Sequence, residues 1–124
     1  MDERKVYFVG MHNKPGMTPL DSKTMSGKMI DAIIKELPLE CIKTNLFEGE
    51  YLPKDFLIIN KAGIDWHEKY NPKECDTVVL LGRWVQENFW HDGFKIIKLP
   101  HPASCMGNVN KELYIKNAIE KIKA

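Results

Sequence analysis

Short apolar runs, each followed directly by a polar cluster, are the feature that most constrains the fold of this chain. Four such runs are expected to be β-strands, and segments with helical spacing lie between them. The expected strands are residues 5–9, 40–46, 77–81 and 94–99. Strands that alternate with helices are typical of a parallel sheet covered by helices on both faces. We therefore predict a single three-layer α/β/α domain over residues 1–124, with a four-stranded parallel sheet.

Two segments of the chain have the amphipathic spacing of helices. Residues 25–37 are expected to form a helix that is capped by Asp21 or Ser22 and ended by Pro38. Residues 111–123 are expected to form the last helix. The side chains expected to face the core are Met25, Met29, Ile30, Ile33, Ile34 and Leu37 in the first segment, and Leu113, Ile115, Ala118, Ile119 and Ile122 in the second. Both helices would pack on the sheet through these apolar stripes.

The segment between the second and third strands has a weaker pattern. Residues 47–76 are interrupted by residues that favour turns, namely Pro53, Asn60, Gly63 and Pro72. We expect loops there, with one or two short helical turns. A short helix is expected at residues 83–89, directly after the third strand.

Charge and cysteine content exclude several classes of protein. The formal net charge is +1, so a nucleic-acid partner would need a local basic face rather than a basic protein. The three cysteines, Cys41, Cys75 and Cys105, form no Cys-x-x-Cys pair, which argues against a disulfide framework and a structural zinc site. We expect no signal peptide, and no apolar run in the sequence reaches membrane-spanning length. We expect a cytoplasmic, intracellular monomer without a metal, a cofactor or a membrane partner.

A histidine between two prolines follows the fourth strand directly. In Pro100-His101-Pro102-Ala103-Ser104, the prolines restrict the backbone on both sides of the ring. An imidazole held in this way at a strand end can donate a hydrogen bond to a developing anion. The alternative is a surface turn in which the histidine has no role.

Two other strand ends carry polar groups that could share a ligand with His101. The loop after the first strand begins at Gly10 and contains His12, which could polarise a water, and Asn13, which could orient one. The second strand leads into Asn45, whose amide has donors and an acceptor that match the edge of a nucleobase. A flexible loop and a turn-forming asparagine are the alternative interpretations. Because ligands bind outside the carboxyl ends of parallel strands, we expect these groups to converge.

Three other kinds of site have less support in the sequence. Ser26-Gly27-Lys28 fails the pattern of a phosphate-binding loop, because Ser22 stands where a glycine is needed and Met29 follows the lysine. The histidines lack the spacing of metal ligands. Cys105, which follows His101 in the same loop, is weak support for a thiol nucleophile.

Taken in order, these motifs resemble those of the uracil-DNA glycosylase superfamily. Residues 9–16 resemble its first motif, in which a strand is followed by a glycine and a Pro-Gly pair. Ser26-Gly27-Lys28 is similar to a Ser-Gly-Arg segment of the thermostable branches, and Thr44-Asn45 is similar to the strand end that reads uracil. Residues 101–104, His-Pro-Ala-Ser, resemble the second catalytic motif. The similarity covers most of residues 5–120 and is weakest over residues 47–76.

The resemblance implies a metal-independent DNA glycosylase. Such an enzyme hydrolyses the N-glycosidic bond of uracil, or of another deaminated or modified base, that is flipped out of DNA during base-excision repair. His101 would then stabilise negative charge on the leaving base, and Asn13 or His12 would position the attacking water. The base would contact Asn45, Gly10, Met11 and Leu20. The DNA would contact Pro15, Gly16, Ser26, Gly27, Lys28, Pro102, Ser104 and Met106, with Met106 as a wedge in the duplex.

The chain departs from the superfamily pattern at two places. Extra residues separate Gly10 from Pro15, so His12 and Asn13 both stay candidates for the water-activating role. Ser22 stands where an aromatic residue usually stacks on the base, so Leu20 or an aromatic ring from elsewhere would take this place. The alternative functions are therefore a catalytically inert relative that binds DNA or a protein partner, and a nucleoside or nucleotide hydrolase.

Overall fold

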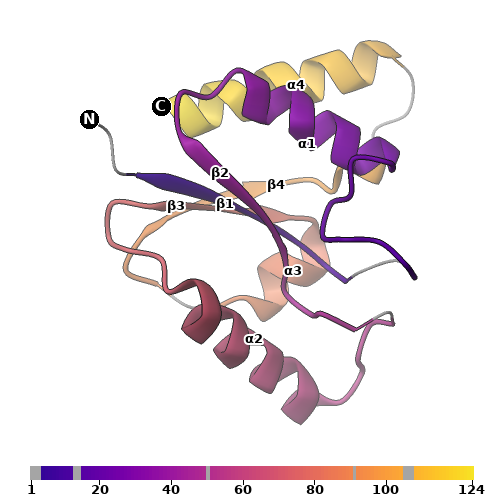
Figure 1. Cartoon of the computed structure of the whole chain (residues 1–124), viewed down its shortest axis with the longest axis vertical. Helices are drawn as coiled ribbons and strands as arrows, with labels where there is room; N and C mark the ends of the chain where they lie inside the picture. The colour runs from indigo at the N-terminus through magenta and orange to yellow at the C-terminus, as the bar shows by residue number, and fades with distance from the viewer. Residues whose placement is uncertain (1–3, 13–14, 50, 91, 105–107) are drawn as a thin grey trace.

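A computed structural model describes residues 4–12, 15–49, 51–90, 92–104 and 108–124 of the chain. Strands and helices alternate along this part of the sequence (Figure 1). The elements are β1 (Lys5–Gly10), α1 (Met25–Lys35), β2 (Glu40–Asn45), α2 (Phe56–Tyr70), β3 (Thr77–Leu81), α3 (Arg83–Asn88), β4 (Lys95–Leu99), the 3-10 turn η1 (Pro102–Ser104) and α4 (Asn108–Lys123).

The strands of the described residues form one parallel sheet of four strands in the order β2-β1-β3-β4. In the centre of the sheet, Val6 of β1 pairs with Cys41 of β2 on one side and with Thr77 of β3 on the other. The chain therefore leaves β1 in one direction to form β2 and later returns past β1 to form β3. This change of direction creates a topological switch point between β1 and β3, where open α/β sheets bind ligands. The predicted α/β fold with a four-stranded parallel sheet is confirmed.

Helices cover both faces of the sheet and enclose two cores. Helices α1 and α4 lie on one face, and α2 and α3 lie on the other (Figure 1). Because successive strand residues point to opposite faces, Val6 and Phe8 pack under α1 and α4, while Tyr7 and Val9 pack against α2 and α3. All four side chains are buried. Burial of each side chain of this size contributes about 1.5–3 kcal/mol to folding.

Helix α2 lies where the sequence predicted loops with one or two short helical turns, and that prediction is wrong. The helix begins at a capping residue, Asp55, whose carboxylate accepts a hydrogen bond of 2.8 Å from the Leu57 N–H. It ends at Asn71, which has a left-handed backbone with φ of 43°. Phe56 and Leu57 at its start are 72% and 74% exposed. Apolar residues therefore occur on the outer face as well as the inner face, which hides the helical period.

The two amphipathic helices differ from prediction in detail. Helix α1 is capped by Thr24 rather than by Asp21 or Ser22, because Thr24 Oγ1 accepts the Gly27 N–H at 2.9 Å. Met25 was expected to face the core, but it is exposed.

In α4 the expected inward residue Leu113 is exposed as well, and Tyr114 is buried in its place. Tyr114, Ala118 and Ile122 form the buried stripe, whose spacing of four residues matches a helix face. Leu113 lies next to this stripe in sequence, so its side chain points away from the sheet.

Candidate functional site

The four strands end at the same edge of the sheet because they are parallel (Figure 1). Gly10 and Asn45 are the last residues of β1 and β2, and they pair with each other. Gly82 follows β3, and His101 follows β4 by two residues. The predicted convergence of these groups at the carboxyl edge therefore agrees with the topology. Whether they can contact one ligand depends on where their side chains lie.

The imidazole of His101 is oriented by hydrogen bonds within its own loop. The Ala103 N–H donates to His101 Nδ1 at 3.0 Å. The Ser104 N–H and hydroxyl donate to the His101 carbonyl at 2.9 Å and 2.7 Å, and Pro102 between them is buried. Because Nδ1 is the acceptor, the neutral ring carries its hydrogen on Nε2. His101 therefore has a hydrogen-bond donor in a fixed orientation at the carboxyl edge.

The end of β4 is tied to β3 and α3 just before this loop. The Leu99 carbonyl accepts hydrogen bonds from the Gly82 N–H at 2.9 Å and from Gln86 Nε2 at 2.8 Å. Gly82 has φ of 90° and ψ of 162°, a conformation that is essentially restricted to glycine. A Cβ at this position would also lie 3.2 Å from the Cβ of His101. Gly82 therefore lets β3, α3 and the His101 loop meet closely.

A hollow of about 320 Å³ opens in front of His101. This volume is within the range of small-ligand pockets. Its wall combines apolar side chains from the loop after β1 with polar groups from that loop and from the start of α1. The lining residues from the predicted site are Met11, His12, Leu20, Ser26 and His101. The hollow therefore has room for a small ligand beside His101.

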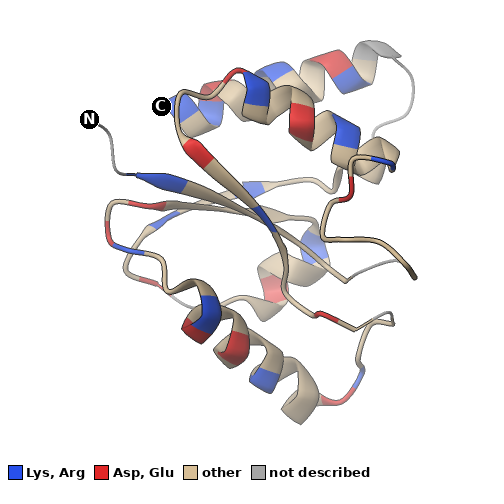
Figure 2. Cartoon of the chain, viewed as in Figure 1, with Lys and Arg blue, Asp and Glu red and all other residues tan. Residues whose placement is uncertain are grey.

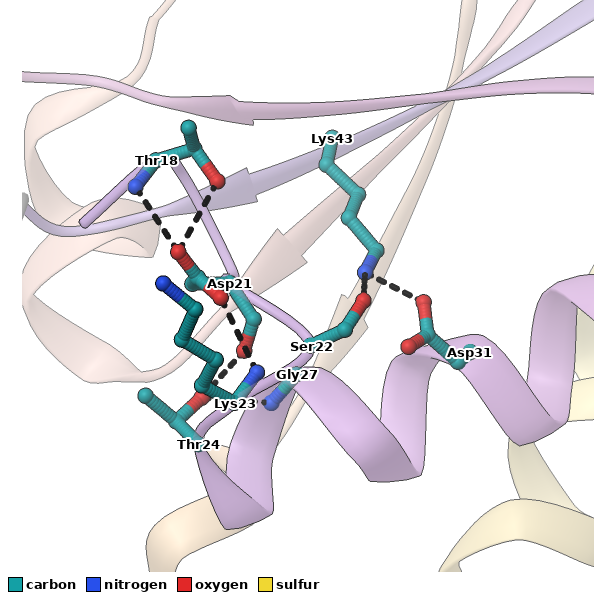
Figure 3. A network of polar contacts seen from close by, with 8 residues as sticks. All are labelled: Thr18, Asp21, Ser22, Lys23, Thr24, Gly27, Asp31 and Lys43. Atoms are coloured by element: carbon teal, nitrogen blue, oxygen red, sulfur yellow. Dashed lines mark hydrogen bonds and ion pairs between the residues drawn. The ribbon is translucent and has the colours of Figure 1, made fainter.

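Asp21 also lines this hollow, in a network drawn in Figure 3. One carboxylate oxygen accepts the Lys23 N–H at 2.9 Å, and the other accepts the N–H and hydroxyl of Thr18 at 3.2 Å and 3.3 Å. The hydrogen bonds from the Lys23 and Thr18 backbone lower the pKa of Asp21 below its ordinary value. The carboxylate is therefore ionised at neutral pH.

Sequence reasoning considered Asp21 only as a helix cap and missed its place in the hollow. The available signal was an aspartate in a Thr-Pro-Leu-Asp-Ser-Lys turn, because such a side chain often bonds the N–H two residues later. That signal indicates a turn and does not indicate a pocket.

Asn45 is buried, and its neighbour Thr44 is bonded to helix α2 and to strand β1. The Trp66 indole N–H donates to Thr44 Oγ1 at 2.8 Å, and the Thr44 hydroxyl donates to the Phe8 carbonyl at 2.9 Å. Pairing between β1 and β2 continues beyond the strands, since the Leu46 N–H donates to the Gly10 carbonyl at 2.9 Å. The residues on both sides of Asn45 are thus fixed to β1 and to α2.

The Asn45 amide lies over Gly10. A Cβ on Gly10 would lie 2.5 Å from Asn45 Oδ1 and 3.2 Å from Leu20 Cδ2. The amide and the Leu20 side chain therefore meet above the end of β1, in space that any larger residue at Gly10 would fill. Leu20 has a left-handed backbone with φ of 50°, which is uncommon for a leucine.

Asn45 and His101 line different hollows. Asn45 lies in a second hollow of about 450 Å³, with Phe47, Trp66 and paired charges of α2 in its wall. His101 lies in the first hollow. Leu20 lines the first hollow and meets Asn45 above Gly10, so this residue stands where the two hollows approach each other. A base that contacts both Asn45 and His101 would lie across this position.

The Ser26-Gly27-Lys28 segment begins α1, as the resemblance implies, but its backbone donors serve the helix. The Gly27 N–H donates to Thr24 Oγ1 at 2.9 Å, and the Lys28 N–H donates to the Thr24 carbonyl at 3.0 Å. A Cβ on Gly27 would lie 1.9 Å from the Asp21 carbonyl oxygen. Glycine is therefore needed here for close packing of the turn, while the Lys28 side chain is exposed.

The remaining predicted residues divide into two groups. Pro15, Gly16 and Ser104 are exposed beside the carboxyl edge, and Gly16 has φ of 73°. Asn13 and Met106 lie outside the described residues, so their predicted roles stay predictions.

Charge at the surface is mixed. Figure 2 shows Lys and Arg interspersed with Asp and Glu along the helices, and Lys43 contacts Asp31 and Ser22 beside the start of α1 (Figure 3). Within the described residues, no group of three or more His, Cys, Asp or Glu side chains is placed to hold a metal ion. No helix in the same residues is long and apolar enough to cross a membrane.

Comparison of the sequence with models of known protein families and with curated proteins gives no match.

Proposed function

We propose that this protein is a DNA glycosylase similar to those of the uracil-DNA glycosylase superfamily. Its substrate would be uracil, or another deaminated or modified base, flipped out of DNA. The proposal is supported by the order of the motifs in the sequence and by the arrangement of His101, Asn45 and the loop after β1 at one edge of a parallel sheet. A single observation carries it, namely the hydrogen bond from the Ala103 N–H to His101 Nδ1.

This bond matters because of what the reaction needs. Hydrolysis breaks the bond between the sugar C1′ and the base nitrogen, so that negative charge develops on the base while water adds to C1′. With its hydrogen on Nε2, the ring of His101 can donate to a carbonyl oxygen of the leaving base. A donor that is already oriented stabilises the developing charge without reorganisation, which is worth about 3 kcal/mol.

The other groups would select the base and supply the water. The buried Asn45 amide has both donor and acceptor atoms and would read the edge of the base. His12 lines the hollow of His101 and would contact the water, together with Asn13. The ionised carboxylate of Asp21 in the same hollow would favour positive charge that develops on the sugar.

The test is base release from oligonucleotides that contain uracil, hypoxanthine or a mismatch, in single- and double-stranded form, with EDTA present. Abasic sites are detected by alkaline cleavage, and free nucleosides are included to test for a nucleoside hydrolase. We expect release of one base from DNA, and a rate in His101→Ala that is on the order of 10²-fold lower.

Two matched variants make this test specific for Nε2. His101→Gln places an amide N–H near the position of Nε2 and is expected to retain more activity than His101→Ala, whereas His101→Asn places it near Nδ1 and is expected to behave like His101→Ala. Unchanged base release in His101→Ala would rule out the proposed mechanism.

A second candidate function is DNA binding without base release. No Phe, Tyr or Trp is found among the described residues that line the His101 hollow, so an aromatic platform for the base is not provided from there. If the wild type binds the DNA panel in a fluorescence anisotropy assay but releases no base, this second function replaces the first.

A further inference from the structure

Tyr114, in the C-terminal helix α4, makes a polar contact with the loop that carries His101. Its hydroxyl donates a hydrogen bond of 2.6 Å to the Pro100 carbonyl, 14 residues earlier in the chain. The side chain is 7% exposed and belongs to the core between α1, α4 and the sheet. A short bond from a nearly buried hydroxyl holds the carbonyl of the peptide that joins Pro100 to His101.

The preceding carbonyl is fixed from the other side of the sheet. Leu99 accepts from the Gly82 N–H and from Gln86 Nε2, which belongs to α3. Helices α3 and α4 cover opposite faces of the sheet (Figure 1). The two carbonyls before His101 are therefore held from opposite layers, so that the direction in which the loop leaves β4 is set on both faces.

Beyond this point the His101 loop has bonds within itself, through Ala103 and Ser104. Such bonds hold the shape of the loop but do not orient it relative to the hollow. Contacts of η1 with α1 hold the C-terminal part of this loop. Tyr114 supplies a side-chain bond at its near end, and it comes from an element that contributes none of the predicted site residues.

From this geometry we infer that Tyr114 is a positioning residue for His101. The inference rests on the proposed function for its catalytic consequence: the Tyr114 hydroxyl aims the Nε2–H of His101 at the leaving base. Misplacement of a catalytic group by about 1 Å can lower a rate on the order of 10²-fold. Loss of one hydroxyl should allow a smaller shift, and we expect a kcat about tenfold lower with KM changed less than about twofold.

The experiment compares Tyr114→Phe with Tyr7→Phe. Both tyrosines are nearly buried, and the Tyr7 hydroxyl also donates to a backbone carbonyl, that of Tyr70, at 3.5 Å. Tyr7 packs against α2 and α3, on the other face of the sheet from Tyr114. Tyr7→Phe therefore removes the same group from a similar environment that has no bond to the His101 loop, and it should leave kcat unchanged.

A second measurement does not depend on activity. The ¹⁵N NMR spectrum of the imidazole, assigned with His101→Ala, distinguishes a ring with its hydrogen on Nε2 from one with its hydrogen on Nδ1. In the wild type and in Tyr7→Phe we expect the Nε2–H form alone. In Tyr114→Phe we expect the same form, because the Ala103 N–H lies within the loop, but with shifted and broadened imidazole resonances, because the loop is no longer held at Pro100.

These two measurements separate the inference from the proposed function. If the wild type releases no base, the proposed function fails, but the NMR comparison still tests whether Tyr114 orients the ring. If Tyr114→Phe matches the wild type in both kcat and the imidazole spectrum, the inference is wrong. It is equally wrong if Tyr7→Phe lowers kcat as much as Tyr114→Phe, because the effect would then reflect general loss of stability.

Discussion

Asn45 ends β2 and His101 follows β4, the two outer strands of the same sheet, and the two residues are held in different ways. His101 is bonded by two residues within three positions of it, Ala103 and Ser104. Asn45 lies next to Thr44, which is bonded to Trp66 of another layer, and its amide rests over Gly10 of the neighbouring strand. One side chain is placed by its own loop, and the other is placed by the packing of distant segments.

This difference indicates which substitutions would displace His101 and which would displace Asn45. A locally bonded loop keeps its internal shape when the surrounding core loosens, so it is damaged by changes at its ends. A side chain held by packing is damaged by any change in the layers that meet there. Substitutions at matched positions can therefore displace one of these two side chains and leave the other in place.

The largest expected effect comes from the same substitution at the two glycines of the edge. Gly82→Ala places an alanine in a conformation restricted to glycine and meets the Cβ of His101 at 3.2 Å, so we expect about 3 kcal/mol of destabilisation. Gly10→Ala meets the amide oxygen of Asn45 at 2.5 Å and the side chain of Leu20 at 3.2 Å, and side chains can move to another conformation for about 1 kcal/mol. Urea denaturation measures both values.

The same two variants also test the comparison between His101 and Asn45 in an assay of base release. Gly10→Ala should remain folded and lose discrimination between bases, because the Asn45 amide has been displaced. Equal destabilisation by the two substitutions would show that the positive φ of Gly82 adds nothing to the cost of side-chain crowding.

An intermediate effect is expected from loss of the bond between Trp66 and Thr44, the residue before Asn45. Thr44→Val keeps the shape of the side chain but removes the acceptor of the Trp66 indole N–H. A buried donor without its partner costs about 2 kcal/mol. We expect that loss of unfolding free energy in urea, together with weaker discrimination between bases and an unchanged His101 imidazole spectrum.

Thr44→Ser is the matched control, since it keeps the hydroxyl and loses only a methyl group. It should cost about 1 kcal/mol, close to the value for one buried methyl. A Thr44→Val variant as stable as Thr44→Ser would mean that the Trp66 bond contributes nothing to holding this strand end.

The smallest effect concerns the loop after β1, where Asp21 is bonded locally, as His101 is. Because its folded-state pKa lies below the ordinary value of 3.8, the ionised carboxylate stabilises the folded state. This contribution is fully present above pH 3.8 and is lost as the pH falls through the lowered pKa. Asp21→Asn should therefore be less stable than the wild type at pH 6, and the difference should vanish in strong acid.

Thermal unfolding of both proteins from pH 6 to pH 2 measures this difference. The pKa of Asp31 is lowered too, because hydrogen bonds from Lys43 and Ser22 outweigh the raising effect of burial. Asp31 is present in both proteins, so its contribution cancels. A stability difference that persists unchanged at the lowest pH would show that the carboxylate charge does not order this loop.

The sheet could be predicted from the sequence because its strands are signalled locally. Residues 77–81 are apolar at almost every position, as a strand covered on both faces requires, and β3 occupies those residues. Helix α2 could not be predicted in the same way. Its exposed Phe56 and Leu57 break the amphipathic pattern, and the bond from the Leu57 N–H to Asp55 that starts it is a detail of geometry.

The site, too, has features that local sequence predicts and features that it does not. Two prolines around His101 predict a stiff loop, and the structure describes a 3-10 turn there with a bond from Ala103 to the His101 ring. The contacts around Asn45 involve Leu20 and Gly10 above the end of β1, and Trp66 through Thr44, which are far apart in sequence. Asp21 shows the same limit, since its turn is visible in the sequence but the hollow it lines is made by other segments. Long-range packing leaves no mark in local residue patterns.

The central position of β1 has a consequence for how the chain is made. Its first N–H donates to the side chain of Asp76, 71 residues away, at the start of its neighbour β3. During synthesis β1 and β2 therefore leave the ribosome well before the strand that covers the other side of β1. An unpaired strand edge invites pairing with other chains, and contacts so distant in sequence form slowly. We therefore expect this edge of β1 to be open to pairing with other chains until residues 77–81 have emerged.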